Sequence, residues 1–150
     1  MTLPDPYLGQ KFEMGQLPLD PANSKVGYYI MGMNRPGRTD NDVPLVIGNA
    51  GGPALSVFFL NFVGCGPYQV DVKTGQISVN EKNSFTNFAD YLLPEFPLGN
   101  GWSHTDEPVR TIEQNNADFL LFMEKLGEKH PNINKTRPIW FAGGSFAGTL

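Results

Sequence analysis

Cysteine is almost missing from this chain, because Cys65 is the only one among 150 residues. A single thiol excludes an internal disulfide framework and any metal site built from several cysteines. Long apolar runs are also missing, since no stretch approaches the roughly 18 residues that a membrane-spanning helix needs. The first 15 residues carry no basic segment and no apolar segment, so they do not look like a secretory signal.

Charge of one sign is not concentrated in any part of the sequence. Fifteen acidic and eleven basic residues give a net charge of -4 at pH 7, without a block of like charge. We therefore expect neither nucleic acid nor a membrane surface as a partner. Glycine and proline are abundant instead, with 17 and 13 residues, yet 40% of the residues are apolar. These proportions indicate a loop-rich globular protein with a hydrophobic core.

Short apolar segments alternate with longer helical patterns along the chain. Residues 1–25 carry several prolines and are expected to be an irregular lead-in to one domain at residues 26–150. Residues 34–42 have the composition of a turn, and residues 56–63 form either a helical turn or a core-lining loop. Alternating strands and helices indicate an α/β protein. The predicted strands are residues 26–33, 43–47, 76–80, 89–93 and 137–142.

One long helix is predicted at about residues 106–128, just before the last strand. Thr105 or Asp106 can cap its start, and Pro108 falls in the first turn, where a missing N–H costs nothing. Gly127 is expected near its end. The apolar residues at helical spacing are expected to face the sheet: Ile112, Phe119, Leu120, Met123 and Leu126.

The last predicted strand leads directly into Gly143-Gly144-Ser145-Phe146-Ala147, and we expect that strand to be buried. A serine with small residues two positions before and after it is typical of a nucleophile elbow. Such a turn lifts the Ser145 hydroxyl above the sheet and directs the N–H of Phe146 toward a developing oxyanion. Two other interpretations are a plain strand-to-helix corner and a phosphate loop. The phosphate loop is disfavoured, because no lysine follows and the glycine spacing is not G-x-G-x-x-G.

A glycine-containing loop earlier in the chain, at residues 50–53, strengthens the elbow interpretation. Ala50-Gly51-Gly52-Pro53 follows the strand predicted at residues 43–47, in the chain order expected for an acyl-transfer site. Such a site needs a second N–H donor for the oxyanion, and glycines let the backbone approach the substrate closely.

With these two loops the sequence resembles the serine carboxypeptidase family, peptidases of the α/β-hydrolase fold. The resemblance extends from about residue 26 to Leu150 and includes several motifs in the family's order. These are residues 43–53 (P-L-V-L-W-L-N-G-G-P-G in the family), 53–67 (ending in E-x-G-P), 84–90 (S-W-N-x-x-A-N), 97–103 (P-V-G-T-G-F-S), the helix to Pro131 (D-L-x-x-F-L, then F/H-P) and 143–148 (G-E-S-Y-A-G).

The resemblance implies a fold and a set of roles. The fold would be the N-terminal part of an α/β-hydrolase sheet with flanking helices, ending just after the elbow. Ser145 would attack a peptide or acyl substrate and form an acyl-enzyme, without a cofactor or a metal. Gly52 and Phe146 would supply the two oxyanion N–H groups, and Gly51 and Trp102 would lie beside the substrate.

Three positions depart from the family pattern for binding the terminal carboxylate of a peptide. Ala50 replaces an asparagine, and Gly64 and Gly144 replace two glutamates. A carboxylate buried without hydrogen-bond donors is disfavoured, so terminal-carboxylate recognition is expected to be weakened. Alternative functions are therefore an esterase or acyltransferase that keeps the elbow, and a non-catalytic relative that serves in structure or partner binding.

The catalytic base is not evident in the sequence. In α/β-hydrolases the serine precedes the acid and the histidine, whereas His104 and His130 both precede Ser145 here. We therefore expect an N-terminal fragment of a longer hydrolase, and we expect the 150-residue chain alone to be inactive. Family members are commonly vacuolar, lysosomal or secreted, but the sequence itself does not assign a compartment. Cys65 is expected to be a buried, unreactive residue.

Overall fold

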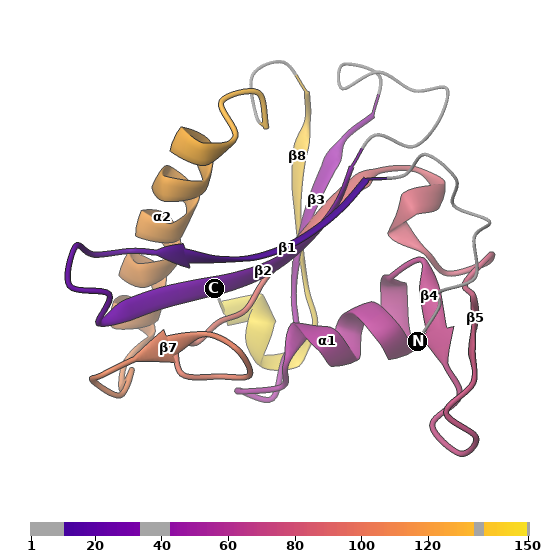
Figure 1. Cartoon of the computed structure of the whole chain (residues 1–150), viewed down its shortest axis with the longest axis horizontal. Helices are drawn as coiled ribbons and strands as arrows, with labels where there is room; N and C mark the ends of the chain where they lie inside the picture. Colours follow the sequence, from indigo (N-terminus) through magenta and orange to yellow (C-terminus); the bar gives the residue numbers. More distant parts are fainter. Residues whose placement is uncertain (1–10, 34–42, 134–136, 150) are drawn as a thin grey trace.

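One strongly twisted sheet forms the centre of the protein. The computed structural model describes residues 11–33, 43–133 and 137–149. The main path through the sheet has the strand order β1-β2-β6-β3-β8, and β7 pairs with β2 beside it. In Figure 1, β1 and β2 run across the direction of β3 and β8, which shows how far the sheet turns from one edge to the other. The turn expected at residues 34–42 lies outside the described residues.

The sheet combines antiparallel and parallel pairs, as the α/β class predicted from the sequence allows. β1 pairs with β2 and β2 with β6 in antiparallel fashion, whereas β3 lies parallel to both β6 and β8. A separate hairpin of β4 and β5 stands beside the sheet. All five predicted strands are confirmed within a few residues. The strands are β1 (Lys11–Pro18), β2 (Lys25–Met33), β3 (Leu45–Asn49), β4 (Tyr68–Val70), β5 (Ile77–Val79), β6 (Asp90–Pro94), β7 (His104–Thr105) and β8 (Ile139–Gly143).

The irregular lead-in expected at residues 1–25 is wrong for residues 11–18, which form β1. Only Pro18 lies within this strand, and it is the last residue, where a missing N–H does not interrupt the ladder. β1 is an edge strand, so its outer side needs no partner. The prolines nearer the N-terminus, which suggested irregular structure, lie outside the described residues.

The helices lie on both sides of the sheet (Figure 1). α1 is a single turn that continues into a π-helical turn, as one of the two interpretations of residues 56–63 predicted. The short 3-10 helix η3 begins at Ser145, directly after β8. The bounds are α1 (Val57–Phe59), η1 (Leu60–Cys65), η2 (Phe85–Asn87), α2 (Ile112–Lys129) and η3 (Ser145–Thr149).

The long helix begins later than the sequence predicted. α2 begins at Ile112, and its cap is Thr111 rather than Thr105 or Asp106. The Thr111 hydroxyl accepts a hydrogen bond from the Gln114 N–H at 3.2 Å, and the Gln114 side chain accepts one from the Thr111 N–H at 3.2 Å. This reciprocal capping box satisfies the first free N–H groups of the helix more fully than one threonine or aspartate can.

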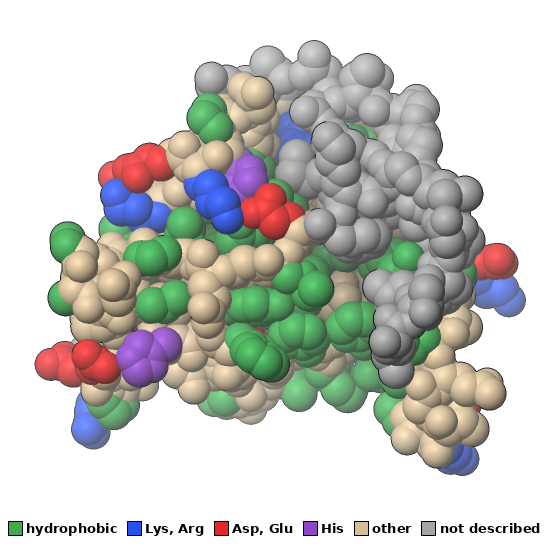
Figure 2. Space-filling view, viewed as in Figure 1, with side chains coloured by type: hydrophobic (Ala, Val, Ile, Leu, Met, Phe, Trp, Pro, Cys, Tyr) green, Lys and Arg blue, Asp and Glu red, His purple; other side chains and the backbone are tan. Residues whose placement is uncertain are grey.

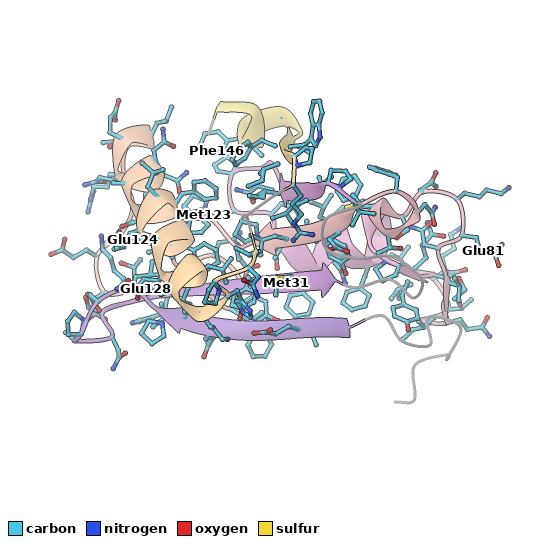
Figure 3. The ribbon with its side chains drawn as sticks, turned by 90° about the horizontal axis from the view of Figure 1, so that it is seen from above. Met31, Glu81, Met123, Glu124, Glu128 and Phe146 are labelled. Carbon is cyan, nitrogen blue, oxygen red and sulfur yellow. The ribbon has the colours of Figure 1, made fainter. Side chains whose placement is uncertain are left out.

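The inner face of α2 also differs from the predicted apolar stripe. Ile112 and Leu120 are 44% and 68% exposed, so they do not face the core. Phe119 and Met123 pack against the core as predicted. Figure 3 shows α2 beside the sheet, with Met123 on its sheet side and Glu124 and Glu128 farther out. The residues of α2 that are fully buried are Asn115, Asp118, Phe122 and Leu126.

Each face of the sheet carries its own hydrophobic cluster. In β2, Tyr29 and Met31 belong to the cluster beneath α2, whereas Tyr28 and Ile30 belong to the cluster beneath α1. This alternation follows from the two-residue period of a strand, which sends successive side chains to opposite faces. Both faces of the sheet centre are therefore buried, as in α/β proteins with helices on both sides.

β8 is less buried than the sequence predicted. Trp140 and Phe141 are 64% and 71% exposed, so the expectation of a buried strand is wrong. The reason is position, because β8 stands at the sheet edge and only β3 pairs with it among the described residues. An apolar sequence indicates that a strand can be buried, but whether the strand is buried depends on the elements that pack against it.

A polar cluster joins β1, β2 and the end of α2. Lys129 donates to Glu13 at 2.9 Å and to the Tyr29 hydroxyl at 2.6 Å, and Tyr29 donates to Glu13. His130 lies 3.3 Å from the same carboxylate. Figure 2 shows basic, acidic and histidine side chains meeting on this face beside α2. Burial raises the pKa of Glu13, but hydrogen bonds from Tyr29 and Lys129 and nearby positive charge outweigh it, so the pKa is lowered overall.

We predict that this cluster stabilises the fold more at neutral pH than in acid. Because the folded-state pKa of Glu13 lies below its ordinary value of 4.5, the stabilisation is present above that value and lost as the pH falls through the folded-state pKa. Urea unfolding of wild type and Glu13→Gln should differ at pH 7, and the difference should shrink at about pH 3. Glu128→Gln, in an exposed pair with Lys125, is the control with a small effect at both pH values. An equal difference for Glu13→Gln at both pH values would contradict the prediction.

Candidate active site

The candidate site lies where two parallel strands end together. β3 and β8 run parallel with Asn49 opposite Gly143, so their carboxyl ends reach the same edge of the sheet. In sheets of this kind, the loops that follow the carboxyl ends form the usual ligand site. Here the loops are residues 50–55 after β3 and residues 144–146 after β8.

The turn after β8 is tight and strained. Ser145 has a φ of 59°, a conformation that side-chain-bearing residues seldom adopt. A Cβ atom on Gly143 would lie 2.5 Å from the carbonyl oxygen of Ala147, so a larger residue does not fit there. The Ala147 N–H donates to the Gly144 carbonyl at 3.2 Å and closes the turn. The backbone therefore has the geometry that the elbow motif predicted, and the Ser145 side chain is exposed.

The glycine loop after β3 lies directly against this turn. A Cβ atom on Gly51 would lie 2.6 Å from the Gly144 carbonyl oxygen, 2.9 Å from the Ser145 Cβ and 3.3 Å from the Phe146 nitrogen. Gly52 follows with a φ of 126°, which only glycine adopts without strain. The structure thus brings Gly51 and the elbow together, as the sequence predicted for two loops of one site.

Trp102 makes its ring contacts with Tyr28 of β2 and Phe58 of α1. Its indole ring lies 6.4 Å from the ring of Tyr28 and 6.2 Å from that of Phe58, and its side chain is 63% exposed. Phe58 stacks on Tyr28 at 5.6 Å. Trp102 therefore belongs to an aromatic group over α1 and β2, and its place beside the substrate stays a prediction. Burial, followed by the negative charge of Glu95, raises the pKa of Tyr28 beneath it.

Sequence reasoning missed Glu95, whose side chain is completely buried beside these loops. Its carboxyl accepts hydrogen bonds from the Ser56 hydroxyl, from the Val57 N–H at 3.3 Å and from the Trp102 N–H at 2.6 Å. A signal was present, because Glu95 is the only charged residue in the apolar run of residues 91–98. A buried carboxyl group of this kind requires hydrogen-bond donors around it, which indicates a structural or functional role.

Neither histidine of the chain contacts a residue of the elbow in the interactions that the described part of the structure records. His104 lies 3.0 Å from Asp106, and His130 contacts Glu13 and the ring of Tyr29. Both are thus engaged with other partners. Asp106, one of the two expected caps of the long helix, lies before α2 and pairs with His104 instead.

Other chemical groups in the described residues give no competing site. Cys65 is buried, and this burial raises the pKa of its thiol to about 12, which makes it unreactive at neutral pH. No group of three or more His, Cys, Asp or Glu in the described ranges is arranged to hold a metal ion. Within those ranges, no helix has the length and apolar character needed to cross a membrane.

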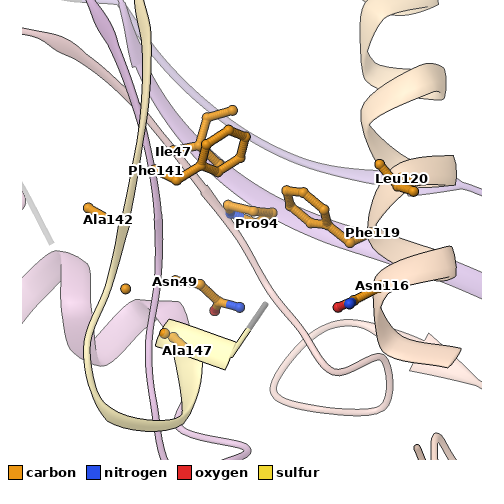
Figure 4. A pocket seen from close by; sticks show the side chains of 11 residues that line it. Ile47, Asn49, Pro94, Asn116, Phe119, Leu120, Phe141, Ala142 and Ala147 are labelled. Carbon is orange, nitrogen blue, oxygen red and sulfur yellow. The ribbon is translucent and has the colours of Figure 1, made fainter. Parts of the chain in front are cut away.

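A hollow of about 540 Å³ lies on the α2 side of the same strand ends. Figure 4 shows it between β3, β8 and α2, with Asn49 and Asn116 as its labelled polar side chains. The side-chain amide of Asn49 is shielded from solvent and makes no hydrogen bond in the described structure. The apolar lining residues are Ile47, Pro94, Phe119, Leu120, Phe141, Ala142 and Ala147.

Comparisons with known proteins all lead to carboxypeptidases. The family model described as serine carboxypeptidase matches residues 4–150. Serine carboxypeptidase-like 36 of Arabidopsis thaliana is 33% identical over 131 residues, which cover 85% of this chain and 26% of that protein. Pheromone-processing carboxypeptidase KEX1 of Candida tropicalis is 31% identical over 135 residues, which cover 89% of this chain and 18% of that protein.

A solved structure gives the same result for the fold. The prohormone-processing carboxypeptidase Kex1 of Saccharomyces cerevisiae superimposes with a TM-score of 0.81 at 26% sequence identity. The match covers 97% of this chain and 33% of that structure. The chain therefore spans about a third or less of the relatives that it matches.

We predict that the contact between the two loops tolerates no side chain at Gly51. A methyl group there would meet the backbone of Gly144 and the Ser145 side chain, so Gly51→Ala should lower the free energy of unfolding by about 1–3 kcal/mol. Gly144→Ala is the matched control, because a Cβ atom there meets nothing within 4 Å. It should change stability by no more than about 0.5 kcal/mol. Equal stability of the two variants in urea unfolding would show that the loops are not in contact.

Proposed function

Because the chain belongs to the serine carboxypeptidase family, we propose that Ser145 is the nucleophile of a serine-type carboxypeptidase acting on peptides. The observation that carries this proposal is the positive φ of Ser145 at the end of β8, beside Gly51. Strain of this kind is expected where a side chain must be presented to a substrate. A plain strand-to-helix corner does not need a serine in that conformation.

The proposed reaction uses the Ser145 hydroxyl and two backbone N–H groups near it. The Ser145 hydroxyl oxygen attacks the scissile carbonyl carbon while its proton passes to a general base. The carbonyl oxygen becomes negatively charged, and the N–H groups of Gly52 and Phe146 donate hydrogen bonds to it. Collapse expels the C-terminal amino acid, whose amine takes the proton from the base, and leaves an acyl-enzyme on Ser145. Water, giving a proton to the base, then attacks the carbonyl carbon of this ester; the shortened peptide leaves with its new carboxyl group, and the base returns the proton to the Ser145 oxygen.

We propose that the general base comes from outside these 150 residues. His104 and His130 are supported as structural residues by their partners, Asp106 and Glu13. In α/β-hydrolases the acid and the histidine follow the serine along the chain. Without a base the serine hydroxyl remains a weak nucleophile, so the 150-residue chain alone should turn over substrate slowly if at all.

The second candidate function keeps the nucleophile and changes the acyl group. Ala50, Gly64 and Gly144 carry no side-chain donor or acceptor, whereas family members use an asparagine and two glutamates at these positions to bind a terminal carboxylate. Gly144 adjoins Ser145, and the space where its side chain would begin is empty among the described residues. An esterase or acyltransferase of the same family needs no carboxylate pocket, and this observation favours that alternative.

We expect a fluorophosphonate probe to label the gene product at its natural length and to leave Ser145→Ala unlabelled. The probe reacts with an activated serine, so the labelling rate reports the nucleophile and its base together. The 150-residue chain, tested in parallel, should label no faster than its own Ser145→Ala variant. A natural-length protein that folds but does not react would contradict the proposed role of Ser145. Ser145-dependent labelling of the short chain would contradict the need for an outside base.

We expect Gly144→Glu to restore a preference for peptides with a free terminal carboxylate. The open space beside Gly144 can accept the side chain, and a protonated or hydrogen-bonded glutamate can help to hold a carboxylate. The measurement, made on the natural-length protein, is the ratio of kcat/KM for a blocked dipeptide to kcat/KM for its terminal amide. The ratio should rise about 10-fold, as one added hydrogen bond to a charged group allows. Gly144→Ala is the control, and an equal ratio in both variants would count against a carboxypeptidase.

A further inference from the structure

Glu95 is held in one place by the central sheet. Its backbone N–H donates to the Tyr28 carbonyl at 2.8 Å and continues the pairing of β2 with β6 beyond Pro94. Its side chain is completely buried, so protein groups and not solvent must satisfy its carboxyl oxygens. A buried carboxyl is costly unless hydrogen-bond donors surround it, and these donors show what it holds.

The donors come from two separate loops. Ser56 and Val57 begin α1 directly after the loop of residues 50–55, and both donate to the same carboxyl oxygen of Glu95. Trp102, in the second glycine loop of residues 98–103, donates its N–H to the other oxygen at 2.6 Å. One buried carboxyl thus joins the start of α1 to the second glycine loop.

The two loops also pack closely around the Glu95 carboxyl group. A Cβ atom on Gly101 would lie 2.1 Å from a Glu95 carboxyl oxygen, so the second loop approaches as closely as only glycine allows. A hollow of about 450 Å³ is lined by Pro53 and Ala54 from one loop and by Gly99 and Asn100 from the other. The loops therefore face each other beside the candidate site.

We propose that Glu95 is a positioning residue that fixes the loop of residues 50–55 against the second glycine loop and so aims the Gly52 N–H at the oxyanion. The inference rests on the proposed function, since it assigns a support to the oxyanion donor of Ser145. The link is short, because Ser56 follows Gly52 by four residues and the Leu55 N–H donates to the Gly51 carbonyl at 3.1 Å. An oxyanion donor is effective only when it is held in place before the reaction.

Glu95→Gln is the informative variant, because it keeps the size of the side chain and replaces one acceptor oxygen with an NH2 group. That group cannot accept a hydrogen bond, so either Trp102 or the start of α1 loses its partner. Asp90→Asn is the matched control. Asp90 is also a buried carboxyl on β6, but it pairs with Arg137 at 2.6 Å at the opposite end of the strand. The two variants separate an effect on the site from the general cost of disturbing a buried acid.

The first measurement is fluorophosphonate labelling of the natural-length protein, expressed per folded molecule. Glu95→Gln should label about 10- to 100-fold more slowly than wild type, as expected for an oxyanion donor that is displaced but present. With a substrate, kcat should fall while KM changes little. Asp90→Asn should stay within about twofold of wild type. Equal rates for Glu95→Gln and wild type would overturn the proposal.

The second measurement, amide hydrogen exchange, does not depend on activity. In Glu95→Gln, residues 50–57 and 99–103 should lose protection together, whereas Asp90→Asn should leave both protected. Exchange that is unchanged in both segments would overturn the coupling. If wild type does not label but the two segments respond together, the role of Ser145 fails while the coupling by Glu95 stands. Should Glu95→Gln not fold, Ser56→Ala removes one donor and should shift labelling and exchange in the same direction.

Discussion

The close approach of two backbones at the carboxyl ends of β3 and β8 is the constraint on which the rest of the structure depends. Parallel pairing places Asn49 opposite Gly143, and the loops that follow must then pass within van der Waals distance of each other. Glycine at Gly51 and a strained backbone at Ser145 are the consequences. The cost of that strain is borne by the sheet, whose two buried faces hold both strand ends in place. The strained turn presents the Ser145 side chain to solvent.

Two polar clusters, one partly exposed and one buried, connect outer elements to the sheet. On one side, Glu13, Tyr29 and Lys129 tie β1 and β2 to the end of α2. On the other side, Glu95 ties the start of α1 to the second glycine loop. Both clusters use a carboxylate whose donors come from distant parts of the chain. For the buried Glu95, such contacts fix geometry more than they add stability, because desolvation offsets much of their energy. It is therefore reasonable that one of them lies beside the candidate site.

Much of the fold could be predicted from local patterns, and the site could be predicted from motifs. The strands appear where β-branched and apolar runs occur. The loops that follow β3 and β8 meet, as their chain order indicated. Three features were not predicted, and two of them depend on distant partners. Residues 11–18 become a strand only because β2 offers them an edge. α2 begins at Ile112 because Thr111 and Gln114, three residues apart, form a reciprocal capping box, a local pattern that the sequence contains. Trp140 and Phe141 on β8 are exposed because the sheet has no further strand beside them among the described residues.

The most direct test of the central claim is a crystal structure of the natural-length protein after reaction with a phosphonate inhibitor. The account predicts a covalent bond from the Ser145 oxygen to phosphorus. It also predicts that the phosphonyl oxygen lies about 3 Å from the nitrogens of both Gly52 and Phe146. The Gly51 backbone should remain packed against Gly144, as it is here. A phosphonyl oxygen that points into solvent, with the Gly52 N–H turned away from it, would contradict the account.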